Sequence, residues 1–345
     1  MRTGSALKLA SLAVALMAVA VAASGSSAGG DASDTRGLIR HVAAADGRIA
    51  WMDSVWRLKT QVVASGAETS TLYTRQYEEL PSVPFGAVTL EPRRLVLAGS
   101  RLLWVSHRAG QGSFVSDRVY TMPLGRTTPR LLRRLDNDGS QGSFVTGIAG
   151  DDSGMSYAFI TIKAAQPDGG GPHELTGGGV VDVKRGALVP GVPPSYLMAR
   201  RLDRIAVVPL SSRDTGGVEW PREKRVEVRD ASTGALETTV SPGAVWAAAL
   251  SDGVITVMTG GREIQSSVAY DPYARLVVGA RLIRYAIPDG RRLGSRAFTV
   301  PVWPQLEATG TPSWLEASAR SSVLTRQLGA SPRSHRPAAG GRSRA

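Results

Sequence analysis

Five segments of the chain share a tight turn followed by a short apolar strand, at nearly even intervals. The turns are marked by Gly47, Ser100, Gly154, Asp203 and Gly253, which are 53, 54, 49 and 50 residues apart. A period of about 50 residues indicates one small structural unit that is repeated along the chain. Such a unit cannot bury both of its faces alone, so neighbouring units must stack against one another.

Each repeat also contains a second hairpin after the marker. The clearest example joins Val226–Asp230 to Leu236–Val240 through the turn Ala231-Ser232-Thr233-Gly234, and another turns at Pro288-Asp289-Gly290. Glycine supplies the positive φ that such turns require. Two hairpins give four strands in each repeat, and four antiparallel strands per 50 residues are typical of a β-propeller blade. The sequence therefore predicts an all-β fold.

Two motifs resemble known bacterial propellers. These are an apolar strand followed by a turn and R-[IL]-[AL]-W, as at 46–51 and 99–104, and V-x-V-x-D-x-x-T-G-x-L at 226–236. They are similar to TolB-like, WD40-like and PQQ-like exported propellers, and the resemblance covers about residues 37–302. The WD dipeptide and the GH pair of WD40 repeats are absent, and no PQQ-binding constellation is evident. The resemblance implies a binding scaffold and carries over no active-site residue.

The repeats predict a propeller over residues 37–316. Five blades are clear, at 38–86, 87–137, 140–192, 195–242 and 244–300, and an incomplete sixth blade begins at Val302; five or seven blades are the alternatives.

The C-terminal residues 317–345 contain no acid and form an atypical basic tail. The capping-box pattern of Ser313 and Glu316, with Leu315, Ala319 and Val323 at helical spacing, predicts a short helix before a disordered end. An altered reading frame would also produce such an abrupt change.

The N-terminal residues have the three parts of a secretory signal. Arg2 and Lys8 are followed by an apolar run at 9–23 and an A-x-A site at 20–22. We expect residues 1–23 to be a signal peptide and 24–36 a flexible linker, with an uncleaved anchor as the alternative. The mature chain is then extracytoplasmic, without a membrane span and monomeric. Because the chain contains no cysteine, packing must stabilise it without disulfides.

The net charge of +12 does not indicate a nucleic-acid-binding protein. Two positive charges lie in the signal and six arginines follow the last acid, Glu316; without these eight, the body of the chain carries +4. The strong preference for arginine over lysine is typical of a high-GC, actinobacterial-like genome. We expect no nucleic acid among the partners.

Few residues are candidates for a chemical site. Asp136 and Asp138, with Asp151 and Asp152 one strand later, are candidate ligands of a calcium ion, because oxygen ligands at alternate positions before glycine resemble part of a Ca²⁺ loop. The sequence favours a plain turn as the alternative interpretation. The segment Q-G-S-F-V occurs at 111–115 and again at 141–145, as a chance or local duplication or as a shared binding loop. Trp104 occupies a repeat position that predicts core packing.

The sequence favours a non-enzymatic scaffold that binds a protein, a peptide or a cell-wall ligand such as a glycan. No catalytic residue or cofactor site is predicted. The alternative is an extracytoplasmic hydrolase or lyase with its active site at the mouth of the propeller channel, because residues gathered from several blades leave no linear motif.

Overall fold

All the regular elements of the described residues are β-strands. The computed structural model describes residues 41–45, 48–52, 57–62, 70–74, 89–109, 115–138, 141–164, 173–210, 225–265, 275–309, 311–317, 323–327 and 333–335. Neighbouring strands in every sheet are antiparallel where their register is defined, for example β1 with β2 and β10 with β11. The all-β prediction is therefore confirmed. The predicted signal peptide and linker lie outside the described residues.

The strands form five hydrogen-bonded sheets. The first contains β1 (His41–Ala45), β2 (Arg48–Met52), β3 (Arg57–Val62) and β4 (Ser70–Thr74). The second contains β5 (Thr89–Ala98), β6 (Arg101–Ala109), β7 (Val115–Pro123), β8 (Arg130–Asn137), β9 (Gln141–Asp151), β10 (Gly154–Ala164), β11 (His173–Asp182) and β12 (Ala187–Leu188). The third contains β13 (Ser195–Arg201), β14 (Arg204–Pro209), β15 (Val226–Asp230) and β16 (Leu236–Val240).

The last two sheets are interleaved in sequence. The fourth contains β17 (Val245–Ser251), β18 (Val254–Thr259), β21 (Arg281–Ala286) and β22 (Arg292–Ala297). The fifth contains β19 (Arg262–Gln265), β20 (Arg275–Val278), β23 (Val302–Thr309), β24 (Thr311–Ala317), β25 (Val323–Gln327) and β26 (Arg333–His335). The hairpin β19–β20 is thus inserted between two strands of the fourth sheet but pairs with the fifth.

Two of these sheets are joined internally by a single residue pair. Asn137 of β8 pairs with Gly142 of β9, and Val277 of β20 pairs with Val302 of β23. Division at these joints separates β5–β8 from β9–β12, and the hairpin β19–β20 from β23–β26. With the other three sheets this gives six four-stranded units. We call them units one to six: β1–β4, β5–β8, β9–β12, β13–β16, the sheet of β17, β18, β21 and β22, and β23–β26. The limits of the first five match the predicted repeats.

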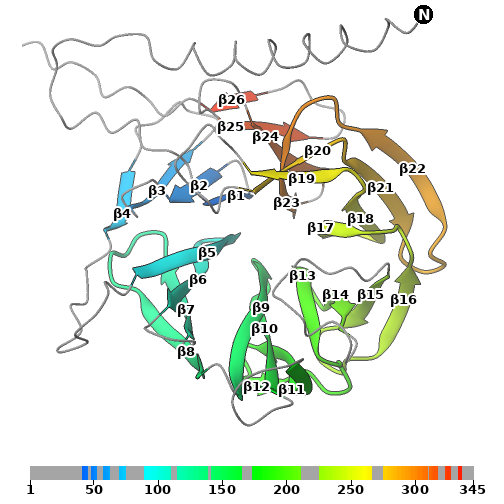
Figure 1. The fold of residues 1–345 in the computed structure, drawn as a ribbon. Helices are drawn as coiled ribbons and strands as arrows, with labels where there is room; N and C mark the ends of the chain where they lie inside the picture. Colours follow the sequence, from blue (N-terminus) through cyan, green and yellow to red (C-terminus); the bar gives the residue numbers. More distant parts are fainter. Residues whose placement is uncertain are drawn as a thin grey trace, which may run out of the picture.

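The first strand of each unit lies nearest the centre of the molecule (Figure 1). These inner strands contact one another in sequence, from β1 to β5, β9, β13, β17 and β23, and β23 contacts β1 again. Within the described residues the first and last units share no hydrogen-bonded ladder, so they meet through packing.

The prediction for the C-terminal part is wrong. Residues 311–317 and 323–327 are strands β24 and β25, where a short helix was expected after an incomplete repeat. Trp314 pairs with Leu306 of β23 and with Arg326 of β25. The capping-box pattern is a local preference, and cross-strand pairing on both sides of β24 outweighs it.

The repeated turns have the same geometry in several units. In units three, four and five, the N–H of Gly186, Gly234 and Gly290 donates to the carbonyl oxygen four residues earlier. Their φ angles are 65°, 73° and 66°, a region that glycine adopts without strain. The turn glycines of the sequence motif therefore have the role that was predicted for them.

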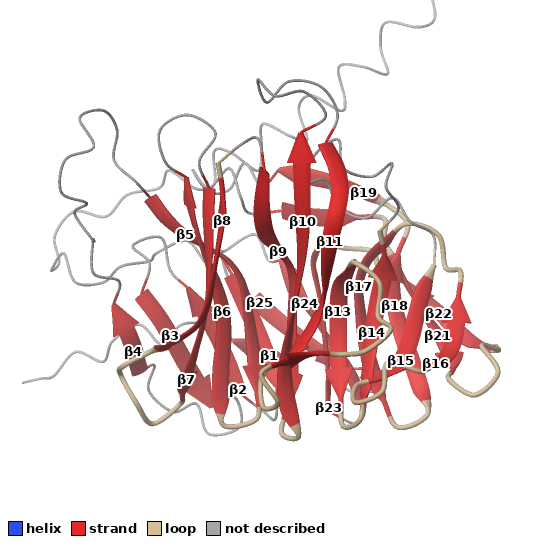
Figure 2. Ribbon diagram, turned by 90° about the horizontal axis from the view of Figure 1, so that it is seen from below, coloured by secondary structure: helices blue, strands red, loops and turns tan. Residues whose placement is uncertain are grey.

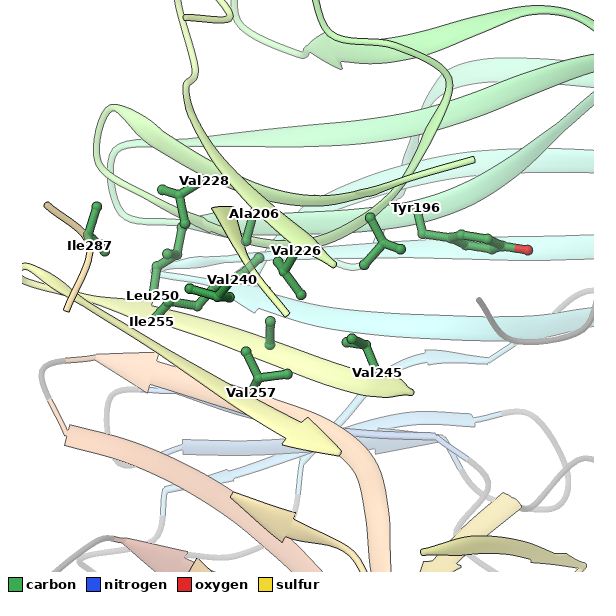
Figure 3. Packing of buried hydrophobic residues seen from close by; sticks show 13 residues of the cluster. Tyr196, Ala206, Val226, Val228, Val240, Val245, Leu250, Ile255, Val257 and Ile287 are labelled. Carbon is green, nitrogen blue, oxygen red and sulfur yellow. The ribbon is translucent and has the colours of Figure 1, made fainter. Parts of the chain in front are cut away.

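Apolar clusters lie between successive units and form the core. Between units four and five, Val226, Val228, Ile255 and Val257 are fully buried (Figure 3). Comparable clusters join the other neighbours from unit one to unit six. Trp104 is 2% exposed and stacks on Tyr120 with ring centroids 5.5 Å apart, so its predicted core role is confirmed.

Candidate functional site

Unit three has longer strands than the unit that follows it. Its first three strands have 11, 11 and 10 residues, close to the 10, 9 and 9 of unit two, whereas those of unit four have 7, 6 and 5. The tight turns of the two units lie side by side, because the Ser153 hydroxyl donates to the carbonyl oxygen of Leu202 at 3.1 Å. The four or five extra residues therefore project at the opposite end, by roughly 13–17 Å at about 3.3 Å per residue. Figure 2 shows β9, β10 and β11 rising beyond β13–β16.

We call this projection the raised end and define it as residues 141–145, 159–164 and 173–178. Two β-bulges lie near its base, where Thr146 of β9 and Thr176 of β11 have no cross-strand partner in the β10 register. A bulge bends its strand and changes the direction of the residues after it.

Both neighbouring units fix the base of the raised end. The N–H of Val145 donates to the buried carboxylate of Asp117 in unit two at 2.7 Å. The Thr146 hydroxyl donates to the Ser195 carbonyl of unit four at 2.6 Å. The raised end is therefore a continuation of a packed sheet that is held from both sides.

The two faces of the raised end differ in polarity. Ser143 and Thr161 pair in register, and their hydroxyls lie 2.8 Å apart. Lys163 and Glu174 also form a cross-strand pair and are both exposed. The other face consists of Phe144, Ile160, Ile162 and Leu175, of which the two isoleucines are buried while Phe144 and Leu175 are half-buried. The half-buried aromatic ring and leucine thus offer apolar surface on one face, and the exposed polar groups lie on the other.

The outer edge of the raised end has no strand beside it in the part of the chain that is described. β12 pairs only with Val181 and Asp182, so β11 is bonded on its β10 side alone from His173 to Gly179. An edge strand of this kind presents N–H and C=O groups that can pair with another strand. Position 178 requires glycine, because a Cβ there would overlap the carbonyl oxygen of Phe159.

Val115, the last residue of the first Q-G-S-F-V copy, lies one strand away from the second copy. The second copy opens β9, and of the first copy only Val115, at the start of β7, is described. Asn137 at the end of β8 pairs with Val115 on one side and with Gly142 on the other. A shared binding loop remains a prediction, but the structure brings the strands that carry both copies to the same end of the sheet.

The four calcium candidates do not form one site. Asp136 and Asp138 lie where β8 ends, and Asp151 and Asp152 lie at the far end of β9, which is 11 residues long and so spans roughly 35 Å. Asp138 Oδ1 accepts the Gln141 N–H at 2.8 Å, which is the turn that was the alternative interpretation. Within the described ranges, no three His, Asp or Glu side chains are grouped to hold a metal ion.

Asp136 and Asp151 instead bind groups of the protein. Burial would raise the pKa of Asp136, but the Arg134 guanidinium, which donates to Oδ1 at 2.9 Å, and the nearby charge of Arg118 outweigh it, so the pKa is lowered. Asp151 Oδ1 accepts the N–H of Ser153 at 2.9 Å, and Oδ2 accepts the N–H of Leu202 at 2.7 Å. Calcium binding therefore stays a prediction that this geometry does not support.

Comparison with known proteins shows only distant structural likeness. No family model and no curated protein matches the sequence. The chain is similar to Pyrococcus horikoshii acylaminoacyl peptidase, with 9% identity over 84% of this chain and 42% of that chain and a TM-score of 0.44. It is also similar to BamB from Moraxella catarrhalis (9% identity, 89% and 76% covered, TM-score 0.33) and to YCF48 bound to a D1 peptide (10% identity, 88% and 82% covered, TM-score 0.40).

The chain thus spans less than half the length of the peptidase, and similarity at these identities transfers no residue role. Across the described strands and turns, no helix is long and apolar enough to cross a membrane.

Proposed function

We propose that the protein is an extracytoplasmic β-propeller of six blades that binds a partner protein or peptide at the raised end, without catalysing a reaction. The observation that carries the binding role is the projection of β9, β10 and β11 beyond the strands of unit four. Units four and five pack against their neighbours with shorter strands, so the extra length of unit three is available for binding.

The chemistry of the raised end favours a polypeptide partner. Its charged residues Lys163 and Glu174 face each other across β10 and β11, so the surface offers no excess of positive charge to a nucleic acid. The unpaired edge of β11 offers backbone groups, and Phe144 and Leu175 offer apolar contacts. Strand addition to a sheet edge uses this combination, in which backbone bonds provide affinity and side-chain contacts provide specificity.

Six blades and an extracytoplasmic location belong to the same proposal. The closed series of contacts among β1, β5, β9, β13, β17 and β23 supports six blades around one axis. The arrangement of charge and apolar residues at 1–23 supports export. An experimental structure with five or seven blades, or a full-length N-terminus in the secreted fraction, would contradict these two parts separately.

Site-specific photo-cross-linking tests the binding site. A photoreactive amino acid at Thr176, which is exposed on β11, should capture one envelope or secreted protein. The matched control is Ser232, which is exposed in the β15–β16 turn at the opposite end of the sheets. The expected result is a discrete cross-linked species from position 176 that is absent from position 232 and weakened by Phe144→Ala or Leu175→Ala. Equal capture at both positions, or turnover of a glycan or peptide panel by the purified chain, would reverse the proposal in favour of non-specific contact or of the hydrolase or lyase.

A further inference from the structure

A second surface of the molecule is strongly basic. Residues 281–297, which form the hairpin β21–β22 of unit five, contain five arginines and one acid, Asp289, a net charge of +4. Excess positive charge also lies elsewhere, as in residues 126–134, which contain four arginines and no acid. The hairpin is distinguished by arginines on both of its faces.

The arginines lie on both faces of this hairpin. The register pairs Arg281 with Ala297 and Tyr285 with Arg292, which places Arg281 and Arg292 on one face. It pairs Leu282 with Arg296 and Arg284 with Gly294, which places Arg284 and Arg296 on the other. All of these arginines are exposed except Arg284, which is half-buried.

The hairpin ends in an open strand. β22 is the last strand of its sheet and pairs only with β21 in the described part of unit five, and it lies at the outer rim in Figure 1. Arg292, Ser295, Arg296 and Ala297 are all exposed along it, and Leu293 is 41% exposed. Arginine side chains therefore lie on both faces of the sheet near the free edge of β22.

Several arginines of this hairpin make local contacts. Asp289, the only carboxylate of the segment, lies 3.5 Å from Arg291 in an exposed pair. Arg292 donates to the Ser295 hydroxyl at 2.7 Å. The Nε of Arg284 is buried without a hydrogen-bond partner.

We propose that the free edge of β22 binds an acidic polypeptide segment in extended conformation, as an added strand whose carboxylates meet arginines on both faces of the sheet. Main-chain bonds would come from the edge, and alternate side chains of the added strand would point to alternate faces. A run of consecutive Asp or Glu residues places carboxylates on both faces, which matches the distribution of the arginines. A flat anionic membrane would reach only one face at a time, so the arrangement suits it less well.

This surface is independent of the raised end. It shares none of its residues and lies on unit five instead of unit three. Failure of one proposal therefore leaves the other unaffected.

The test compares two triple variants of the full chain with equal charge loss. The first is R281S/R292S/R296S on the hairpin, and the control is R130S/R133S/R134S on β8, the outer strand of unit two, where all three arginines are exposed. The probe is a fluorescent peptide of eight glutamates, titrated at low salt and monitored by anisotropy. We expect the hairpin variant to bind about tenfold more weakly and the control to bind within about twofold of the unaltered chain. Circular dichroism and the melting temperature of each variant establish that it is folded.

A second probe tests strand addition. An octaglutamate peptide with an N-methyl group at every backbone nitrogen keeps its charge and loses the donors of both strand edges, and it should bind several-fold more weakly. Equal loss in both triple variants, or undiminished binding of the methylated peptide, would show that net charge alone attracts the probe and would overturn the proposal. Tighter binding of anionic phospholipid vesicles or of duplex DNA, lost in the hairpin variant, would also overturn it and would assign the surface to that polyanion.

Discussion

The carboxylate of Asp151 at the end of β9 accepts a hydrogen bond of 2.7 Å from the backbone N–H of Leu202 in the β13–β14 turn. The Ser153 hydroxyl donates to the carbonyl oxygen of the same leucine at 3.1 Å. Side chains of unit three thus form hydrogen bonds with both the N–H and the carbonyl oxygen of Leu202 in unit four. Leu202 has a φ of 53°, and in the described ranges no other non-glycine residue has a positive φ.

Replacement of Leu202 by glycine should raise stability. The left-handed backbone costs a residue with a Cβ roughly 1–2 kcal/mol, and Gly99 already occupies the equivalent turn position in unit two with a φ of 57°. We expect Leu202→Gly to stabilise the protein by about 1 kcal/mol in urea unfolding, since part of the gain is offset by the greater entropy of glycine in the unfolded chain. Leu236→Gly is the control, because Leu236 is equally exposed but lies in a strand. A destabilised Leu202→Gly variant would show that the two hydrogen bonds remove the strain.

The repeat architecture could be predicted because each repeat contains its own local sequence signals. Turn residues such as Gly234 and Gly253, followed by apolar strands, mark each unit without reference to any other part of the chain. The hairpin β19–β20 was missed because its place in the fold depends on pairing with β23, which is distant in sequence. At the C-terminal end, pairing of β24 with the adjacent strands β23 and β25 outweighed the local preference for a helix.

The raised end could not be predicted as a site. Its position depends on bulges at Thr146 and Thr176, and a bulge has no fixed sequence pattern. The run Gly177-Gly178-Gly179 is a signal that could have pointed to it, because glycines within a strand often mark a bulge or a close backbone approach. The calcium prediction gained no support because it assumed that carboxylates separated by one strand lie close together. They lie at opposite ends of β9.

A buried ion pair joins units three and four. Arg200 of β13 lies 2.7 Å from Asp182 of β11, and both side chains are 7% exposed. Burial would raise the pKa of Asp182, but the N–H of Arg185 and the Arg200 guanidinium outweigh it, so the pKa is lowered. At the equivalent register position between units four and five the chain has a buried leucine, Leu250.

Arg200→Leu should therefore destabilise the protein by about 3 kcal/mol, because it leaves a buried carboxylate without its partner. The double variant R200L/D182A should recover most of that loss, since an apolar interface is tolerated one unit further along. Denaturant unfolding monitored by tryptophan fluorescence measures both. Equal stability of the single and double variants would show that the charge of Asp182 is not what makes the single variant unstable.

Inner strands β9 and β13 approach closely at Gly147. A Cβ on this glycine would overlap the backbone of Leu197, so Gly147→Ala must push two units apart or distort β9. We expect a loss of about 1–3 kcal/mol, as for overpacking of a core. Gly125→Ala is the matched control, because a Cβ there meets nothing within 4 Å, and it should be neutral. If thermal unfolding shows the same melting temperature for both variants, β9 and β13 are less tightly packed than this contact indicates.

The turn after β15 should make stability depend on pH in the acid range. Asp230 Oδ1 accepts hydrogen bonds from the Ser232 hydroxyl and N–H and from the Thr233 N–H and hydroxyl, at 2.6–2.9 Å. These bonds favour the ionised carboxyl and hold the pKa of Asp230 well below its usual value of 3.8. In the unfolded chain the carboxyl takes up its proton near 3.8, so this contribution to stability is fully present above that pH and is lost as the pH falls towards the folded pKa.

Removal of the Ser232 and Thr233 hydroxyls should weaken the dependence of stability on pH. In S232A/T233V the carboxyl keeps fewer bonds, and its folded pKa returns towards 3.8. The variant should be less stable than the unaltered chain at about pH 6, and the gap should narrow only as the pH falls below the variant's folded pKa towards that of the unaltered chain. Urea midpoints at a series of pH values from about 6 to about 1.5 measure the difference. A gap between the two proteins that stays constant across the whole series would show that the hydroxyls stabilise the turn without acting through the charge of Asp230.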